Sequence, residues 1–407
     1  MPMQIADFHI HSKYSRATSK NLDLDALASG AQKKGIDILG TGDFTHPLWM
    51  KELKAKLQEK SSGIYEYKGA KFVLSAEISL MYRQDGKGRR IHHLILAPNF
   101  EVVDQINSFL DTKGRRDYDG RPIFGFSSIE LVENFMSISK DIEIIPAHIF
   151  TPFFSIFGAF SGFDSITECF GEKTKHIHAI ETGLSSDPAM NWRLSQLDNI
   201  TLVSNSDAHS AWPWRLGREA NAFDLKKDFT YKDFLVPIRT KNNFLFTVEV
   251  DPGYGKYHFD GHRNCNVSQN PKRTAETGSK CPKCKKPLTI GVLYRVQELA
   301  DREEDFVPDS AVPFKSLLPL SDTIAAAIGQ NVFTKKVQLI HDMLVDRFKN
   351  EFNVLLNAER KELEKAVDKK IADIILANRE GKIKIEPGYD GVYGKLIWEN
   401  QAAIIEN

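Results

Sequence analysis

The sequence Asp7-Phe8-His9-Ile10-His11 ends the first apolar segment of the chain and places two histidines two positions apart. Residues i and i+2 of a β-strand point to the same face, so both imidazoles would project side by side. Such a pair at a strand end is a suitable clamp for a divalent metal ion, although it also occurs on ordinary polar strand faces. Further histidines and acidic residues after later apolar segments favour the metal interpretation.

The composition is that of a globular protein with a sizeable core. The chain has 407 residues, 42% of them hydrophobic and 27% charged, which predicts two or three domains. The formal net charge is zero, so any surface for nucleic acid must come from local clustering. Because no apolar run reaches transmembrane length and no secretory pattern begins the chain, we expect a cytoplasmic protein without a membrane partner.

Short apolar strands alternate with amphipathic helices through the N-terminal part of the chain. This order predicts an α/β fold with a parallel sheet or a (β/α) barrel, whose active sites lie at the C-terminal ends of the strands. The residues of metal-binding type at such ends are His9, His11, Asp43, Glu77, His93, His148, Asp207 and His209. They exceed what one ion needs, so we expect two or three ions, of Zn, Mn or Mg, with mixed imidazole and carboxylate ligands favouring Zn or Mn. Clustered cations of this kind are the usual solution for phosphoester hydrolysis.

These motifs resemble those of a known superfamily. The segments His9-Ile10-His11, Thr41-Gly42-Asp43, Pro146-Ala147-His148 and Ser206-Asp207-Ala208-His209, with Glu77 and His93, are similar to the polymerase-and-histidinol-phosphatase (PHP) metallophosphoesterases. The resemblance implies a distorted (β/α)7 barrel with three metals. The implied ligand sets are His9, His11, Glu77 and Asp207 for the first, Glu77, His93 and His148 for the second, and Asp43 with His209 for the third. It also implies catalytic roles for Asp207, His209 and Glu77.

The chain departs from the superfamily pattern at two places. Asp43 stands where the superfamily commonly has a histidine, which weakens the case for the third metal. His92 and His93 are adjacent, and His93 is preferred because it directly precedes the apolar run Leu94-Ile95-Leu96. Glu181 is a candidate for an outer partner of the ligands.

A second metal site is indicated further along. His262 and Cys265, and Cys281 and Cys284, form two pairs with the spacing of a tetrahedral structural zinc site. His258 competes with His262 for the fourth position. Lysines and arginines crowd the segment from 256 to 286, which favours contact with a phosphate backbone, although such residues are often only solubilising.

The whole chain resembles the endonuclease Q family of DNA-repair enzymes. The resemblance rests on the PHP motifs, on the segments from Gly255 to Cys265 and from Cys281 to Cys284, and on the terminal Pro387-Gly388-Tyr389-Asp390-Gly391-Val392-Tyr393-Gly394. We expect a PHP barrel at 1–245, a zinc-binding basic module at 246–295 and a C-terminal helical DNA-binding region at 296–407. The implied reaction is hydrolysis of the phosphodiester 5′ to a deaminated base (hypoxanthine, uracil or xanthine) or to an abasic site, with base flipping.

Several residues are candidates for contact with DNA. They are Trp212, Arg215, Arg218, Lys335 and Lys336, the last two at the start of a predicted helix. The alternatives are a PHP-type small-molecule phosphatase and a non-catalytic DNA-binding scaffold. We expect a monomer, and the tail at 401–404 lacks the aromatic pair of a sliding-clamp peptide.

Overall fold

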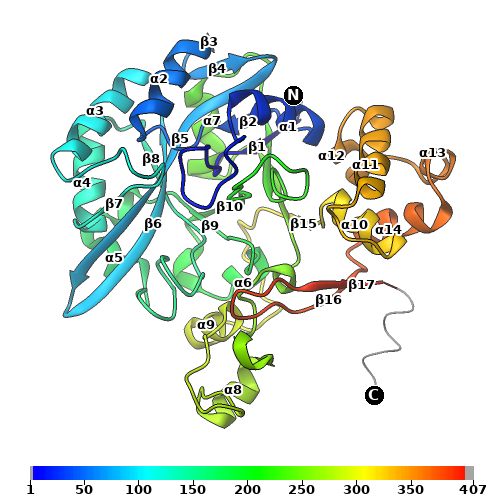
Figure 1. The fold of residues 1–407 in the computed structure, drawn as a ribbon. Helices are drawn as coiled ribbons and strands as arrows, with labels where there is room; N and C mark the ends of the chain where they lie inside the picture. Colours follow the sequence, from blue (N-terminus) through cyan, green and yellow to red (C-terminus); the bar gives the residue numbers. More distant parts are fainter. Residues whose placement is uncertain (1–2, 399–407) are drawn as a thin grey trace.

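The structure is a computed structural model that describes residues 3–398. It is a mixed α/β fold with a large central sheet, a small module at one end and a group of helices at one side (Figure 1). The tail at 401–404, on which the sliding-clamp expectation rests, lies outside the described residues. Between residues 3 and 398, no helix combines the length and the apolar character needed to cross a membrane.

The central sheet has 11 strands and is mixed. Its strands are β1 (Met3–Asp7), β2 (Ile38–Gly40), β3 (Gln58–Ser61), β4 (Ile64–Tyr67), β5 (Ala70–Gln84), β6 (Lys87–Ala97), β7 (Ile123–Phe124), β8 (Glu143–Pro146), β11 (Ala220–Asp224), β12 (Phe244–Glu249) and β15 (Phe314–Ser316). The main order is β15-β12-β11-β1-β2-β5-β4-β3, with β6 and β7 paired to β5 and β8 paired to β6. The run β1-β2-β5 is parallel, but β5 and β6 form a long antiparallel hairpin, so the prediction of a parallel sheet holds only in part.

Two further strands lie beside the ends of the sheet. They are β9 (Ala179–Glu181) and β10 (Thr201–Val203), which pair in parallel. The N–H of Ile149, after β8, donates to the carbonyl of Glu181 at 2.9 Å, and the N–H of His11, after β1, donates to the carbonyl of Ala208 at 3.1 Å. These bonds bring the ends of β1, β8 and β9 and the segment after β10 to the same edge of the sheet.

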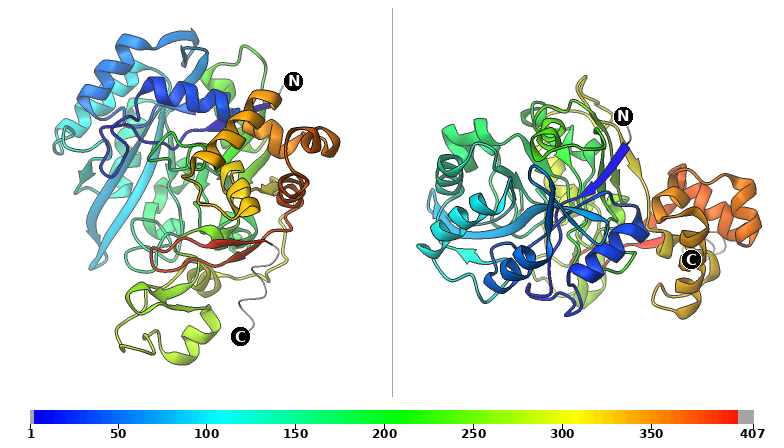
Figure 2. Two further views of the ribbon diagram at one scale, coloured as in Figure 1. Left: turned by 45° about the vertical axis from the view of Figure 1, so that its right-hand side comes forward. Right: turned by 90° about the horizontal axis from the view of Figure 1, so that it is seen from above.

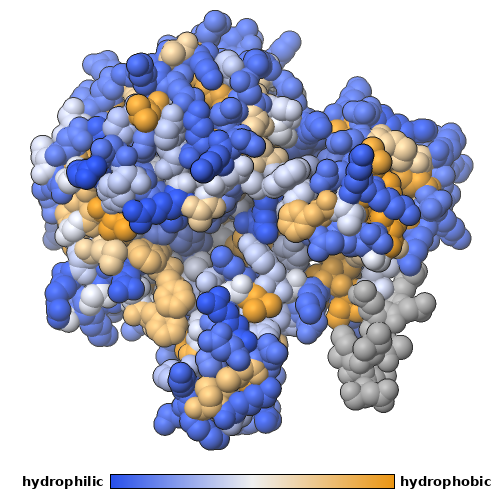
Figure 3. Space-filling view, in the orientation of Figure 1, coloured by the Kyte–Doolittle hydropathy of each residue, from blue (hydrophilic) through white to orange (hydrophobic). Residues whose placement is uncertain are grey.

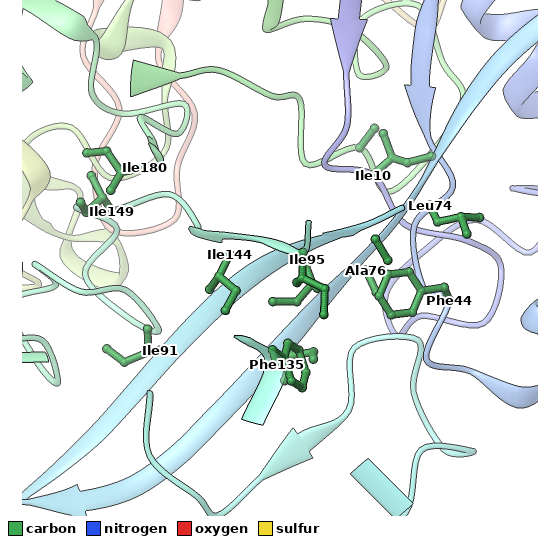
Figure 4. Packing of buried hydrophobic residues seen from close by; sticks show 14 of the residues in the cluster. Ile10, Phe44, Leu74, Ala76, Ile91, Ile95, Phe135, Ile144, Ile149 and Ile180 are labelled. Atoms are coloured by element: carbon green, nitrogen blue, oxygen red, sulfur yellow. The ribbon is translucent and has the colours of Figure 1, made fainter. Parts of the chain in front are cut away.

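Helices lie around the sheet and at its ends (Figure 1). They are α1 (Leu24–Lys34), α2 (Pro47–Lys56), α3 (Phe100–Asp111), α4 (Ser128–Ile138), α5 (Ile166–Phe170), α6 (Pro188–Asn191) and α7 (Tyr231–Thr240). The local sequence sets the ends of α1, because the Asp23 side chain accepts from the N–H of Ala26 and Gly35 ends the helix at a φ of 90°. Apolar side chains fill the space between sheet and helices, as Figure 4 shows for Ile95 of β6, Ile144 of β8 and Phe135 of α4.

The C-terminal helices form a group with a core of their own. They are α10 (Leu320–Ile328), α11 (Lys335–Phe348), α12 (Glu351–Leu356), α13 (Arg360–Ala366) and α14 (Lys369–Arg379). The group lies beside α1 and projects from the body (Figure 2). At the contact, the ammonium of Lys34 lies 2.7 Å from a carboxylate oxygen of Glu351, and the imidazole of His341 lies 3.0 Å from the other. All three side chains are buried, so an ion pair joins the two parts of the molecule.

The small module contains β13 (Asp260–His262), β14 (Val267–Gln269) and α8 (Pro271–Thr277), and α9 (Val292–Leu299) follows it. Its own apolar cluster is limited to Val267, Cys281 and Leu288, with Cys265 against it. A terminal hairpin of β16 (Lys384–Glu386) and β17 (Lys395–Ile397) frames the segment 387–394, which returns to the module.

Backbone contacts tie this returning segment to the residues before the module. Phe259 donates to the carbonyl of Gly388 at 2.9 Å, and Gly394 donates to the carbonyl of Tyr254 at 3.1 Å. A Cβ at Gly394 would lie 2.0 Å from the carbonyl oxygen of Gly253, so only glycine allows this approach.

Candidate metal centre

Four side chains converge at the edge where β1, β5 and β10 end or pass. They are His9, His11, Glu77 and Asp207, and each offers a ligand atom within 4.8 Å of the others. The Nε2 of His11 lies 3.1 Å from Asp207 Oδ1 and 3.3 Å from Glu77 Oε2. The Nε2 of His9 lies 3.5 Å from Glu77 Oε2 and has no hydrogen-bond partner although it is buried. A buried imidazole nitrogen aimed at two carboxylates fits a cation between them.

The opposite nitrogens of both histidines are held by carboxylates. Nδ1 of His9 lies 2.8 Å from Glu181 Oε2, and Nδ1 of His11 lies 3.1 Å from Asp43 Oδ1. Metal-binding histidines commonly donate their second N–H to a carboxylate in this way, which fixes the tautomer and leaves Nε2 as the ligand atom. Glu181 and Asp43 therefore orient the two imidazoles.

A second group shares Glu77 with the first. It consists of Glu77, His92 and His148. Nδ1 of His92 lies 2.6 Å from Glu77 Oε1, and Nε2 of His148 lies 3.3 Å from the same oxygen. One carboxylate thus faces both groups, the arrangement of a ligand that bridges two ions.

The geometry favours His92 over the predicted His93 as the partner of Glu77 and His148. In the register of β5 and β6, Ser79 pairs with His92 and Ile78 pairs with His93. Because Glu77 and Ser79 share a face, His92 lies on the face of Glu77 and His93 lies on the other. His93 instead lies 2.8 Å from the Ser128 hydroxyl and packs against Phe170.

Asp43 and His209 join no group of three candidate ligands within residues 3–398. Asp43 Oδ2 accepts bonds from the Ser12 N–H at 2.7 Å, the Ser12 hydroxyl at 2.6 Å and the Ser15 hydroxyl at 2.9 Å. His209 turns Nδ1 to the carbonyl of Asp207 at 2.9 Å, and its ring packs against His11 with centroids 4.5 Å apart. The carboxylate of Asp43 and Nδ1 of His209 are therefore engaged by neighbouring groups of the protein.

The charges of the centre act differently on its carboxylates and on its imidazoles. Burial opposes charge on His9 and His11, but the neighbouring carboxylates raise the pKa of both imidazoles well above the usual range, so a bound cation would replace their extra protons. Burial favours protonation of Glu77, but His92, Arg121 and His9 hold its pKa well below the usual range. Burial acts likewise on Asp207, yet His209 and His11 hold its pKa well below the usual range. Burial lowers the pKa of His92 to about 4, so this imidazole is neutral at physiological pH. Ionised carboxylates and a neutral imidazole are the forms that bind metal.

The backbone is strained at three of these positions. Asp43, His148 and Asp207 have φ values of 47°, 32° and 45°, a region that residues other than glycine rarely adopt. Each follows a strand end and turns its side chain toward the centre or toward a ligand of the centre. Strain of this kind clusters at functional sites, where surrounding contacts hold it in place.

The module holds a separate group of ligand type. His262, Cys265, Cys281 and Cys284 offer ligand atoms within 4.8 Å of one another, and Nδ1 of His262 lies 3.3 Å from Cys284 Sγ. His258 turns away from this group, with Nδ1 3.3 Å from the carbonyl of Ser185. The geometry thus favours His262 over His258 as the fourth member.

The candidates for contact with DNA occupy different environments. Trp212 is 49% exposed and stacks on Trp214 with centroids 4.9 Å apart, at the rim of a pocket of about 450 Å³ between α1 and the C-terminal helices. The guanidinium of Arg215 lies over the ring of Tyr393 at 4.8 Å.

The cations among these candidates differ in exposure. Arg218 is buried, and its Nε and Nη2 donate to the carbonyl of Ser206 at 3.1 and 2.9 Å, so it holds the loop that carries Asp207. Lys335 and Lys336 are exposed at the start of α11.

Two solved structures are similar to the whole chain. One is the crystal structure of the novel lesion-specific endonuclease PfuEndoQ from Pyrococcus furiosus, with 31% identity, a TM-score of 0.88, and coverage of 99% of this chain and 97% of that chain. The other is an endonuclease Q complex with a 27-mer duplex substrate with an abasic lesion at the active site, with 31% identity, a TM-score of 0.89, and coverage of 100% and 98%. The chain belongs to the endonuclease Q family.

Two curated proteins are similar in sequence to this member of the endonuclease Q family. The Bacillus subtilis protein YqxK is 30% identical over 411 residues, which cover 96% of this chain and 98% of that protein. The Methanocaldococcus jannaschii protein MJ0043 is 34% identical over 292 residues, and this match spans 71% of the chain but only 35% of the longer relative. The family model of the MJ0043 C-terminal domain matches residues 319–382, which contain α10 to α14.

Sequence reasoning weighed His92 against His93 and preferred His93, and it missed Arg121. Strand alternation would have favoured His92, once the pairing of β5 with β6 was assumed. Arg121 follows no metal-binding pattern, yet its guanidinium lies 3.0 Å from Glu77 Oε2. It reaches the centre from the loop before β7, a position that only the tertiary structure reveals.

Proposed function

We propose that the protein is a metal-dependent DNA endonuclease that cuts the phosphodiester 5′ to a deaminated base or an abasic site. The observation that carries the proposal is the pair of ligand groups sharing Glu77, in a chain that matches a lesion-specific endonuclease along nearly its whole length. The related complex with an abasic duplex at its active site supports DNA as the substrate class.

The proposed scaffold is a distorted seven-stranded PHP barrel. Its strands would be β1, β2, β5, β6, β8, β9 and β10, joined by ladder pairing and by the bonds from Ile149 to Glu181 and from His11 to Ala208. In such a barrel the candidate ligands gather at one end, which is the usual place of the active site. We retain 1–245, 246–295 and 296–407 as the proposed limits of barrel, zinc module and helical region.

His9, His11, Glu77 and Asp207 would hold one ion, and Glu77, His92 and His148 would hold the other. Two divalent cations at such a site polarise water and neutralise charge on the phosphate oxygens. Glu77 fixes the separation of the two groups. Mixed nitrogen and oxygen donors favour Zn or Mn over Mg.

Asp207 and His209 lie at the open side of the centre. Their side chains are 30% and 33% exposed, whereas those of His9, His11 and Glu77 are fully buried. Burial lowers the pKa of His209, so its imidazole is neutral at physiological pH and able to accept a proton from the attacking water. Arg121, beside Glu77, would neutralise charge on the phosphate at the same place.

The module would hold a structural zinc ion through His262, Cys265, Cys281 and Cys284. Its own apolar cluster is too small to fold it, so the metal would supply the missing free energy. The basic surface of the module, with Arg215, Lys335 and Lys336, would contact the phosphate backbone. Trp212 would stack on a base of the opened strand, and Arg218 would hold the loop of Asp207 in place.

The direct test compares three substrates. The purified protein is incubated with Mn²⁺ and, in turn, a uracil- or hypoxanthine-containing duplex, an undamaged duplex and a small phosphomonoester. A single cut at the lesion, abolished by a chelator, is expected. Phosphate release from the monoester alone would identify a small-molecule phosphatase, and tight DNA binding without turnover would identify a non-catalytic scaffold.

A further inference from the structure

The loop after His148 exposes two phenylalanines that the core does not use. The sequence from 150 to 163 is Phe-Thr-Pro-Phe-Phe-Ser-Ile-Phe-Gly-Ala-Phe-Ser-Gly-Phe. Phe150, Phe157 and Phe163 are buried and anchor the loop in the main apolar cluster. Phe153 and Phe160 are 37% and 50% exposed. Since the anchoring is complete without them, their exposure calls for another explanation.

The two exposed rings form a flat stack. Their centroids are 4.9 Å apart and their planes differ by 6°. The edge of Tyr257, which precedes the module, meets Phe153 at 6.2 Å and 75°. Figure 3 shows apolar side chains gathered where the body meets the module, on the face seen in Figure 1.

Hydrogen bonds to buried groups hold the loop that carries the stack, and one of them comes from a residue of the metal centre. Arg295 is buried and donates to the carbonyls of Phe157 and Phe163, each at 3.0 Å. The N–H of His92 donates to the carbonyl of Phe154 at 3.1 Å, and the two rings lie 4.7 Å apart. Phe154 has a φ of 59°, a strained conformation for an aromatic residue. The stack is therefore held at a fixed position relative to His92.

Cations flank the aromatic surface. The ammonium of Lys256 lies 5.5 Å from the centre of the Tyr257 ring, and the guanidinium of Arg90 lies 5.9 Å from that of Phe154. Flat aromatic faces with cations beside them match the two parts of a nucleotide, because the base stacks on the ring and the phosphate pairs with the cation.

We propose that Phe153 and Phe160 form a stacking platform for the base that adjoins the damaged nucleotide. This inference rests on the proposed endonuclease function. When the damaged base leaves the helix, its neighbour loses a stacking partner. The platform replaces that partner and so lowers the cost of opening the duplex. Phe153 and Phe160 are positioning residues that act before the phosphodiester is hydrolysed.

The test uses Phe160→Leu, which keeps an apolar side chain but removes the aromatic face. Single-turnover cleavage is measured on a duplex with paired uracil and on the same duplex with uracil in a mismatched loop, where opening is already complete. We expect about a tenfold loss on the paired substrate, within the range for one base stacked on an aromatic side chain, and a much smaller loss on the loop. Phe160→Trp keeps an aromatic face and should cleave the paired substrate at a rate near wild type. Phe306→Leu, at an exposed phenylalanine after α9, is the matched control.

A second readout is the fluorescence of 2-aminopurine placed next to the uracil. Binding of the wild-type protein quenches it, and Phe160→Leu removes the quenching. The platform would be overturned if Phe160→Leu lost cleavage equally on both substrates, or if it left both the cleavage rates and the quenching unchanged. Neither result would affect the endonuclease function, as long as the wild-type protein cuts. Failure of the wild-type protein to cut either substrate would overturn the function itself and the platform with it.

Discussion

The two faces of β6 separate two adjacent histidines, and only one of them lies beside Glu77. His92 lies 2.6 Å from Glu77, whereas His93 lies against Ser128 and Phe170. We expect His92→Ala to lower metal content and to reduce cleavage by more than about 100-fold. Loss of a residue that only orients a ligand costs up to about 100-fold, so a larger loss indicates a ligand itself. The measurements are metal analysis by mass spectrometry and single-turnover cleavage.

The matched control is His93→Gln. It removes the neighbouring imidazole on the other face, so metal content and the cleavage rate should stay near wild type even if the melting temperature falls. Loss of metal in His93→Gln with retention in His92→Ala would contradict the assignment.

The proposed role of Asp207 lies in catalysis and not in DNA binding. Asp207→Asn keeps the size of the side chain but removes the charge between His9 and His11, so cleavage should be lost. Binding of a lesion duplex, followed by fluorescence anisotropy at a stated salt concentration, should change little, because contacts with the phosphate backbone dominate affinity. A parallel loss of affinity would speak against this role.

The sequence predicts contacts of this centre between neighbouring residues better than contacts between residues far apart in the chain. Strand alternation places His9 and His11 on one face, and the structure has them so. The choice between His92 and His93 required the pairing partner of β6, which lies on another strand. Asp43 was expected as a ligand because of its motif, but Ser12 and Ser15, from a loop, engage its carboxylate.

The small module brings four side chains of ligand type together from two segments of the chain. We expect Cys284→Ser to release one equivalent of zinc and to make the segment 260–290 sensitive to protease, because the module has almost no apolar core. Cys169→Ser is the control, since Cys169 is buried in α5 away from this group. Zinc release in both variants, or in neither, would refute a zinc site at these four residues.

The terminal hairpin holds the segment 387–394 against the residues before the module. Gly394→Ala would place a methyl group against the carbonyl of Gly253 and displace the segment 387–394. Faster hydrogen exchange is expected at 253–263, measured by mass spectrometry, with β1 and β5 unaffected. Gly88→Ala, at a glycine with open space around it, should leave exchange at 253–263 unchanged.

A buried ion pair joins the body to the C-terminal helices. Glu351 is buried against Lys34 and His341, and Glu351→Gln leaves a buried ammonium without its partner. We expect a loss of about 3–5 kcal/mol in the free energy of unfolding of the helical group, measured by urea titration. Lys33→Gln, which removes the exposed pair with Asp342, is the control and should cost less than about 1 kcal/mol.

The same pair gives the molecule a defined response to acid. Burial favours the neutral form of Glu351, but Lys34 and His341 lower its pKa from 4.5 to about 2. Because the folded pKa is the lower one, the stabilisation is complete above pH 4.5 and is lost as the pH falls toward 2. The difference in stability between wild type and Glu351→Gln should shrink over this range, and a constant difference would contradict the role of the charge.

Ion pairs between residues this far apart in the chain cannot be predicted from local sequence patterns. Lys34 reads as an ordinary basic residue in the last turn of a helix, and Glu351 as an ordinary acidic residue in the first turn of another. The alternation of strands and helices, the separate C-terminal helices and the paired cysteines are local patterns, so the general mixed α/β architecture could be predicted.

The returning segment 387–394 offers no ligand to either candidate metal site, yet it holds the residues just before the module through Phe259 and Tyr254. A chain shortened to end before residue 384 would keep every candidate ligand of both sites but would lose these contacts. The module would then be free to move relative to the metal centre. Residues that offer no ligand atom therefore set where the module lies.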